Sequence, residues 1–306
     1  MFSESDLLNP FQKTNPEAFV VSKYRESLVE YLYNQDLPKR NYQVVILAAG
    51  QGRRMALDYP KVLYQLHYPG GRASLLDNTL TMVNSLKDSA GIGQVHLVIN
   101  ENDRTYYENQ DFALLVNIVG LSENDIRGTA VCINFIKHLL DSDKGVIFIW
   151  GDLALWRASD IDIATKVQAS VNSCIVFPTR IKINPYVAFL RSKDGKVFKV
   201  VHSNESERFQ EIAEQDCLSF VCSYNSLSLL DEFISDFLIG QKSLQAEVDF
   251  IHYIPYLVSK GESVLGIPIA ESGLVYGLNT SERAQEINGV LSRYSSIEYE
   301  QYFVAT

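Results

Sequence analysis

A run of small residues near position 50 has the composition of a loop that holds phosphate groups. Its sequence is L-A-A-G-Q-G-R-R-M at residues 47–55, and Lys61 follows six residues later. Because small side chains let the backbone come close to a ligand, successive N–H groups of such a loop can converge on an anion. The guanidinium of Arg54 suits bidentate contact with phosphate oxygens, and the Lys61 ammonium suits a point contact beside a reacting phosphorus. We therefore expect a phosphate-binding loop that includes Leu47, Ala48, Ala49, Gly50 and Gly52.

Two better-known phosphate-binding motifs do not fit this spacing. A Walker loop has lysine directly after its second glycine and a hydroxyl residue next, but Lys61 lies nine residues beyond Gly52 and no hydroxyl residue follows it. A dinucleotide-binding fingerprint needs a third glycine where this chain has Met55. The simpler alternative is that the glycines only form a turn and that the basic residues are surface charges. The whole stretch, including Pro60-Lys61, favours phosphate binding.

Three further segments follow this loop in the order found in one enzyme family. They are Arg127-Gly128-Thr129-Ala130, Trp150-Gly151-Asp152 and Gly277-Leu278-Asn279. Together with L-A-A-G-x-G-x-R-M and Pro60-Lys61, they resemble the signature of the sugar-nucleotide pyrophosphorylases. This nucleotidyltransferase family includes N-acetylglucosamine-1-phosphate uridylyltransferase, and the similarity covers about residues 42–288.

The resemblance implies a reaction and a role for each segment. An acceptor phosphate attacks the α-phosphorus of a nucleoside triphosphate and expels pyrophosphate. Arg54 would hold the β- and γ-phosphates and Lys61 the α-phosphate and the acceptor phosphate, while Gly128 and Thr129 would lie beside the nucleotide. Asp152 and Asn279 would hold Mg²⁺, which usually takes only one or two oxygens from a protein and the rest from substrate and water.

The base and the acceptor are less well defined by the sequence. At the position where the related uridylyltransferases have a base-reading glutamine, this chain has Glu123, whose carboxylate accepts hydrogen bonds from several bases. We therefore expect either UTP or CTP as the nucleotide substrate. Asn184, Tyr186 and His202 are the candidate acceptor contacts, although His202 replaces a family glutamate. Because of that departure, the acceptor could be a sugar 1-phosphate, a phosphorylated polyol or a phosphorylated amino alcohol.

The elements that must position these residues alternate between short apolar strands and helices. Strands are expected at 43–47, 95–99, 114–119 and 146–150, with helices at 75–86, 129–140 and 159–169 between and after them. This order predicts an α/β fold with a doubly wound, mostly parallel, Rossmann-like sheet. An acceptor-binding hairpin is expected around Asp194-Gly195, a helix at 248–260, and an added N-terminal helix from Pro16 to Gln35.

The predicted boundaries divide the chain into three parts. They are an N-terminal extension at 1–41, a nucleotidyltransferase domain at 42–288 with nucleotide-binding and acceptor-binding halves at 42–172 and 173–280, and a C-terminal tail at 289–306. We expect that tail to pack as an edge strand, join a dimer or remain mobile.

Composition excludes several other classes of protein. A formal charge of −10 and a pI near 5.0 argue against binding nucleic acid. We find no signal peptide and no run of about 20 apolar residues, so we expect a cytoplasmic protein without membrane contact. The four cysteines lack CxxC spacing, which argues against a zinc site. A homo-oligomer, a non-catalytic nucleotide-binding paralogue and a molybdopterin guanylyltransferase-like enzyme stay open.

Overall fold

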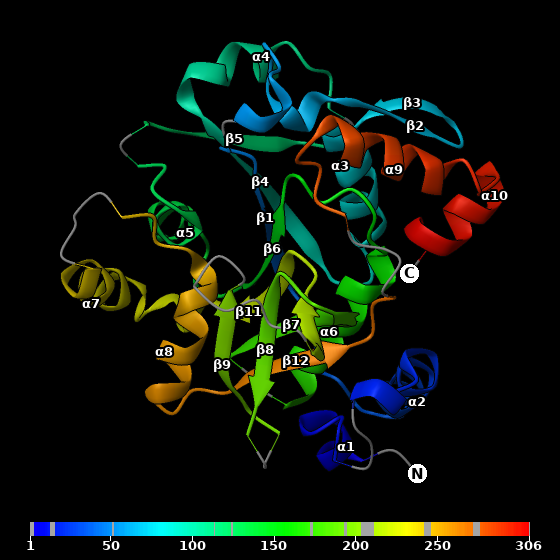
Figure 1. Cartoon of the computed structure of the whole chain (residues 1–306), viewed down its shortest axis with the longest axis vertical. Coiled ribbons are helices and arrows are strands. Elements are labelled where there is room, and N and C mark those ends of the chain that lie inside the picture. The colour runs from blue at the N-terminus through cyan, green and yellow to red at the C-terminus, as the bar shows by residue number, and fades with distance from the viewer. Residues whose placement is uncertain are drawn as a thin grey trace.

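A ten-stranded sheet forms the centre of the molecule, with helices on both of its faces (Figure 1). The computed structural model describes residues 3–12, 16–50, 52–112, 114–123, 125–171, 174–192, 195–202, 211–241, 246–271 and 276–305. The strands in these ranges are β1 (Tyr42–Leu47), β4 (Ile92–Asn100), β5 (Val116–Leu121), β6 (Gly145–Trp150), β7 (Ile175–Ile183), β8 (Val187–Arg191), β9 (Val197–His202), β10 (Ile212–Asp216), β11 (Ser219–Ser223) and β12 (Val264–Pro268), with a separate hairpin of β2 (Gln65–Tyr68) and β3 (Gly71–Ser74). The helices are α1 (Glu4–Leu8), α2 (Val21–Tyr33), α3 (Leu75–Ser85), α4 (Arg104–Glu108), α5 (Thr129–Ile136), α6 (Ala158–Val171), α7 (Leu230–Gln241), α8 (Tyr253–Ser259), α9 (Ser281–Leu291) and α10 (Ser296–Tyr299).

The sheet is mixed, and its first half is wholly parallel. The strand order is β5-β4-β1-β6-β11-β7-β10-β8-β9, with β12 beside β7. Strands β5, β4, β1 and β6 pair in parallel, and β12 is parallel to β7, whereas β11 lies antiparallel between β6 and β7. Parallel strands joined by helices place their carboxyl ends at one edge, where open α/β sheets bind ligands. The predicted doubly wound, mostly parallel fold is confirmed.

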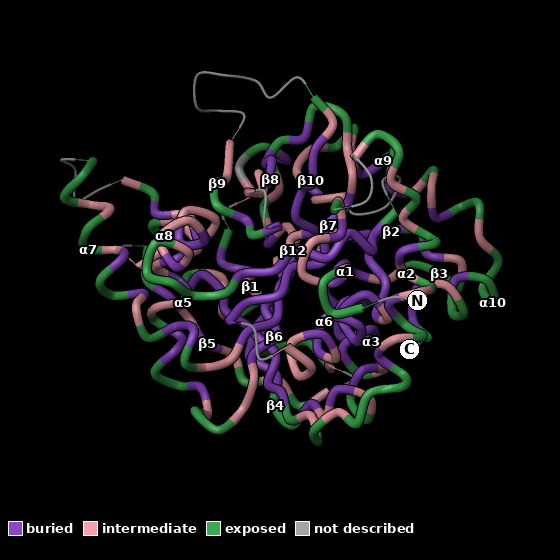
Figure 2. The backbone as a smooth tube through the Cα atoms, turned by 90° about the horizontal axis from the view of Figure 1, so that it is seen from below, coloured by how far each residue is buried: buried purple, intermediate pink, exposed green. Residues whose placement is uncertain are grey.

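Alternating side chains of the strands face two separate apolar cores. On β1, Val44 and Ile46 belong to one core and Val45 to the other, and all three are fully buried. This alternation follows from the two-residue repeat of a strand covered on both faces. Helices α2, α3, α6 and α9 contribute to the first core, and α5, α7 and α8 to the second. Figure 2 shows the resulting buried centre, with exposed segments around its rim.

The predicted elements are largely present, with some differences. The strand pair β8–β9 forms the expected hairpin, in which Gly195 has φ +85° and Asp194 lies outside the described residues. The N-terminal helix α2 begins at Val21 rather than Pro16, because residues 16–18 form a separate 3₁₀ turn. The helix expected at 248–260 begins at Tyr253, since an irregular segment and a 3₁₀ turn precede it. The β2–β3 hairpin was not predicted.

The C-terminal segment is helical and packs into the first core. Helix α10 continues into a π-helical turn at Glu300–Val304, where Phe303 is 1% exposed and stacks on Tyr299. The edge strand considered for this tail is therefore wrong, because residues 296–304 are helical and residues 300–304 contact α3 and α6. Among the helices in the described ranges, none has the length and apolar character needed to cross a membrane.

Candidate active site

A cavity of about 690 Å³ opens at the carboxyl ends of β1 and β6. The residues predicted to bind phosphate, nucleotide and metal all line it. They are Leu47, Ala48, Ala49, Gly50, Gly52, Arg54, Lys61, Glu123, Gly128, Thr129, Asp152 and Asn279. Segments far apart in the sequence therefore meet around one space, at the edge of the sheet where the topology favours ligand binding.

The small-residue loop leaves the end of β1 and is held by its neighbouring strands. The Ala48 N–H donates to the carbonyl of Val98 at 2.7 Å, and the Gly151 N–H donates to the carbonyl of Leu47 at 2.8 Å. Farther along, Gly52 has φ +55°, and a Cβ at this position would lie 3.1 Å from Lys61 Cβ. Glycine therefore permits both the left-handed turn and the close approach to Lys61. Gln51 lies outside the described residues.

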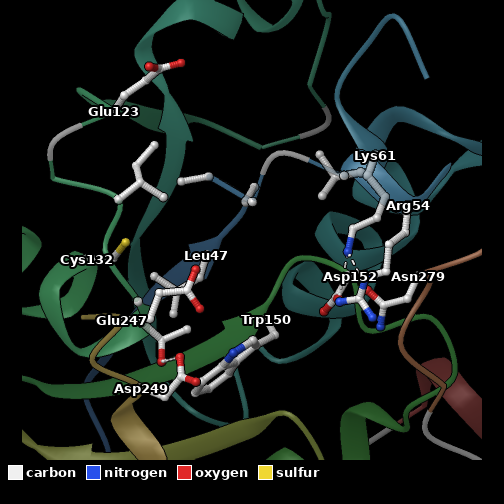
Figure 3. Close-up of a pocket in the computed structure, with 18 residues that line it drawn as sticks. Leu47, Arg54, Lys61, Glu123, Cys132, Trp150, Asp152, Glu247, Asp249 and Asn279 are labelled. Atoms are coloured by element: carbon white, nitrogen blue, oxygen red, sulfur yellow. Dashed lines mark hydrogen bonds and ion pairs between the residues drawn. The ribbon is translucent and has the colours of Figure 1, made fainter. Parts of the chain in front are cut away.

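A short backbone pairing brings Asp152 and Asn279 together. The Leu278 N–H donates to the carbonyl of Asp152 at 2.8 Å, and Leu153 and Gly277 form an isolated antiparallel bridge. The side chains of Asp152 and Asn279 then converge on one atom, Lys61 Nζ, which donates to Asp152 Oδ2 at 2.9 Å and to Asn279 Oδ1 at 3.0 Å (Figure 3). Three predicted residues thus form one cluster at this end of the cavity.

This cluster has a donor set that suits Mg²⁺. One carboxylate oxygen and one amide oxygen are hard ligands, and Mg²⁺ commonly takes only one or two ligands from the protein. The Lys61 and Asp152 side chains are only 12% and 19% exposed, so their charges are partly shielded from water. Within the described ranges, no group of three or more His, Cys, Asp or Glu residues could hold a metal ion. The carboxylate and amide oxygens of Asp152 and Asn279 fit a magnesium site that substrate and water would complete.

The opposite end of the cavity is acidic, and two of its carboxylates were not predicted. Glu247 and Asp249 line this end and flank Val248, which is fully buried. The Val248 N–H donates to the carbonyl of Arg127, and its carbonyl accepts from the Ala130 N–H, both at 2.9 Å. In an extended segment, residues two apart share a face, so both carboxylates face the cavity. Figure 3 shows them near Trp150 and Leu47, away from Lys61.

Gly128 allows this acidic segment to approach α5. It precedes the helix with φ +98°, and a Cβ there would lie 2.4 Å from the Val248 carbonyl oxygen. The Thr129 hydroxyl accepts from the Phe250 N–H at 2.8 Å and lies 3.5 Å from Asp249 Oδ1. The first turn of α5 and the 247–250 segment therefore form one wall.

Two other residues of this wall differ in exposure. Glu123 is exposed at the rim, where Asn102 donates to it at 3.4 Å, and the side chain points away from Glu247. Cys132 lies deeper, and burial raises the pKa of its thiol to about 12. The thiol is therefore protonated at neutral pH, and Cys132 does not provide a thiolate nucleophile.

The predicted acceptor contacts lie outside this cavity. Asn184 has φ +51° between β7 and β8, and the Tyr186 side chain is 51% exposed while its N–H donates to Gln215 Oε1 at 3.1 Å. The backbone of His202 pairs with Val187, and its side chain lies outside the described part of the chain. Their roles stay a prediction.

Comparison with curated proteins finds similarity to the enzyme whose signature the sequence motifs resemble. No family model matches the chain. The bifunctional protein GlmU of Marinomonas sp. (strain MWYL1), an N-acetylglucosamine-1-phosphate uridylyltransferase, is 31% identical over 170 residues, which is 55% of this chain and 34% of GlmU. GlmU of Acetivibrio thermocellus is 26% identical over 251 residues, which is 81% of this chain and 51% of that protein. The chain is similar in sequence to these GlmU proteins. It spans about a third to a half of the length of these relatives.

Two solved structures share the fold of this chain. The inositol-1-phosphate CTP transferase of T. maritima has a TM-score of 0.61 and 17% identity, covering 84% of this chain and 97% of that one. A putative glucose-1-phosphate thymidylyltransferase of Bacillus anthracis has a TM-score of 0.60 and 14% identity, covering 83% and 96%. At these identities the likenesses show the fold alone.

Proposed function

We propose that the chain is a Mg²⁺-dependent nucleotidyltransferase. It transfers a nucleoside monophosphate from UTP or CTP to a sugar 1-phosphate or a similar phosphorylated acceptor and releases pyrophosphate. The observation that carries this proposal is the convergence of Lys61, Asp152 and Asn279 at one end of a cavity bordered by the small-residue loop. A lysine and a candidate metal site beside backbone that can approach phosphates are what a triphosphate requires.

The chain's own residues supply charge and position rather than covalent chemistry. An acceptor phosphate oxygen forms a bond to the α-phosphorus, the bond to the bridging oxygen breaks, and the electron pair leaves with pyrophosphate. Lys61 neutralises charge at the α-phosphate, and Arg54 holds the outer phosphates. Asp152 and Asn279 would hold Mg²⁺, which neutralises phosphate charge and orients both reactants. A phosphate oxygen is already a nucleophile, so the reaction needs no general base.

The acidic wall favours CTP as the first triphosphate to test. Carboxylates such as Glu247 and Asp249 only accept hydrogen bonds, and the cytosine N4 amine donates them. Uracil offers a carboxylate only its N3–H donor, and its O4 atom is an acceptor that a carboxylate would repel. The acidic wall therefore supports an amine-bearing base over uracil, and the ribose hydroxyls are the competing donors.

The test is a matrix of triphosphates and phosphorylated acceptors, with pyrophosphate release as the readout. We expect release only when a triphosphate, an acceptor phosphate and Mg²⁺ are all present. Lys61→Met and Asp152→Asn should each lower kcat by about 10²–10³-fold, the cost of removing one preorganised charge-stabilising group. Lys87→Met, which removes an exposed lysine at the end of α3, should leave kcat unchanged.

Binding without turnover would contradict the proposal. If triphosphates raise the melting temperature but no combination releases pyrophosphate, the chain binds nucleotides without catalysing transfer. Equal activity of Lys61→Met and Lys87→Met would also refute the assigned chemistry, because the cluster would then be dispensable.

A further inference from the structure

Lys61 contacts the same two oxygens that are proposed to hold Mg²⁺. Its Nζ donates to Asp152 Oδ2 at 2.9 Å and to Asn279 Oδ1 at 3.0 Å, and these three groups lie 91 and 218 positions apart in the sequence. The contacts are not incidental surface pairing, because the lysine side chain is only 12% exposed. An ammonium ion that bridges two hard oxygens occupies the place of a cation.

A lysine and a divalent cation cannot both use this place. Each of these oxygens has two lone pairs, so one hydrogen bond from Nζ does not by itself prevent metal binding, but an ion that bridges the same two oxygens would need the position of the ammonium. Two positive charges this close also repel each other strongly in a partly shielded site. Metal binding between the two oxygens therefore requires that the Lys61 ammonium move away.

The side chain of Lys61 can move away from the two oxygens while its backbone stays in place. Its backbone is fixed in the 3₁₀ turn Lys61–Leu63 after Pro60, and Gly52 packs against its Cβ. Beyond Cβ, the flexible stem of a lysine lets the ammonium swing while the backbone stays in place. The cavity that Lys61 lines continues past Gly50 and Arg54, where phosphate groups would offer the ammonium another partner.

We propose that Lys61 is the resident cation of the Asp152–Asn279 site in the free protein and competes with the divalent metal for it. This inference rests on the proposed function for the identity of the metal. The free protein binds the metal weakly, because Asp152 is already neutralised. When the phosphates of a nucleotide draw the ammonium away, the same oxygens become available, so metal and nucleotide bind cooperatively.

The test measures metal binding in the absence of nucleotide, so it does not depend on catalysis. Mn²⁺, which takes the same oxygen ligands, is titrated into the full chain and the free ion is followed by electron paramagnetic resonance. We expect Lys61→Met to bind Mn²⁺ at least about tenfold more tightly than the wild type, since two hydrogen bonds involving charged groups need not be broken.

Two further variants make the result specific. Arg54→Met removes the same charge from the same cavity, but no contact of Arg54 with either oxygen is found among the described interactions, so its Mn²⁺ affinity should rise by about twofold or less through long-range charge alone. Lys61→Met combined with Asp152→Asn should lose the tight binding, because its carboxylate ligand is gone. Circular dichroism verifies that each variant is folded.

The outcomes separate this inference from the proposed function. If Lys61→Met binds Mn²⁺ no more tightly than wild type, or no more tightly than Arg54→Met, Lys61 does not compete with the metal, whatever the activity of the enzyme. If the tight binding appears and persists in the double variant, the metal lies elsewhere and the inference also fails. Tight binding that depends on Asp152, in a protein without transferase activity, supports the inference and rejects only the proposed function.

Discussion

Replacing Gly128 with alanine tests whether the acidic wall of the cavity depends on one close backbone approach. Gly128 precedes α5 with φ +98° and ψ 162°, and a Cβ there would lie 2.4–2.6 Å from three backbone atoms of Val248. These atoms are not the far end of a flexible side chain. The segment that carries Glu247 and Asp249 would therefore have to move away from the helix.

Two effects lower the free energy of unfolding of the Gly128→Ala variant, and they add. Backbone in this positive-φ region is almost restricted to glycine and costs about 1–3 kcal/mol for another residue. Inserting a methyl group into packed structure typically costs about 1–3 kcal/mol more. We expect the free energy of unfolding to fall by about 2–6 kcal/mol, with weaker nucleotide binding because the wall is displaced.

Gly289→Ala is the matched control. Gly289 is exposed in α9, and a Cβ there would meet no atom within 4 Å. The same chemical change should stabilise the chain by about 0.5–1 kcal/mol, since alanine favours a helix over glycine. Urea unfolding followed by circular dichroism compares both variants with the wild type. A Gly128→Ala variant within about 1 kcal/mol of the wild type, with unchanged nucleotide affinity, would refute this account of the wall.

Three further predictions concern the base, a buried ion pair and a buried histidine. Glu247→Gln should lower the ratio of kcat/KM for CTP over UTP by about tenfold, because an amide can donate to uracil O4; an unchanged ratio would show that Glu247 does not face the base. Arg191→Met should lower the free energy of unfolding by about 3–5 kcal/mol, because Glu214 is 2% exposed and would lose the guanidinium bound at 2.5 Å. Arg191→Met with Glu214→Leu should recover part of that loss, and an equal or larger loss would contradict the charge argument. Burial, aided by Lys144, lowers the pKa of His96 below its unfolded value, so the unfolded state binds more protons and stability falls as pH drops below about 6.5. His96→Gln should show a smaller loss between pH 7 and pH 5.5 in urea unfolding, and a loss equal to that of the wild type would show that His96 does not contribute.

The sequence predicted the position of the small-residue loop, because one contiguous segment forms it. Residues 47–55 follow a strand directly, so their position at its carboxyl end follows from the order of elements. The contact of Lys61 with Asp152 and Asn279 could not be predicted in the same way. Periodicity and spacing place each of them after a strand or before a helix, but only the family resemblance joined them across 91 and 218 positions.

Glu247 and Asp249 show why the rest could not be predicted. The residues after Val248 have a helical pattern, so this segment was interpreted as the start of a helix at 248–260. Its extended backbone is instead fixed by hydrogen bonds to Arg127 and Ala130, which are more than 100 positions earlier. Alternation of two acids around a buried valine was the available signal, but three residues are too few to distinguish a strand-like segment from a helix.

The N-terminal extension is joined to the start of α6, which follows the loop after Asp152. That loop ends at Arg157, whose guanidinium donates to the carbonyl of Ile269 at 2.9 Å and pairs with Asp160 at 3.1 Å. Arg25, from α2, pairs with the same Asp160 carboxylate at 3.0 Å. Asp160 is almost fully buried, so loss of either arginine would leave a poorly compensated charge directly beneath the loop. The extension is thus joined by an ion pair to the start of α6, and among the described residues it contributes none to the lining of the cavity.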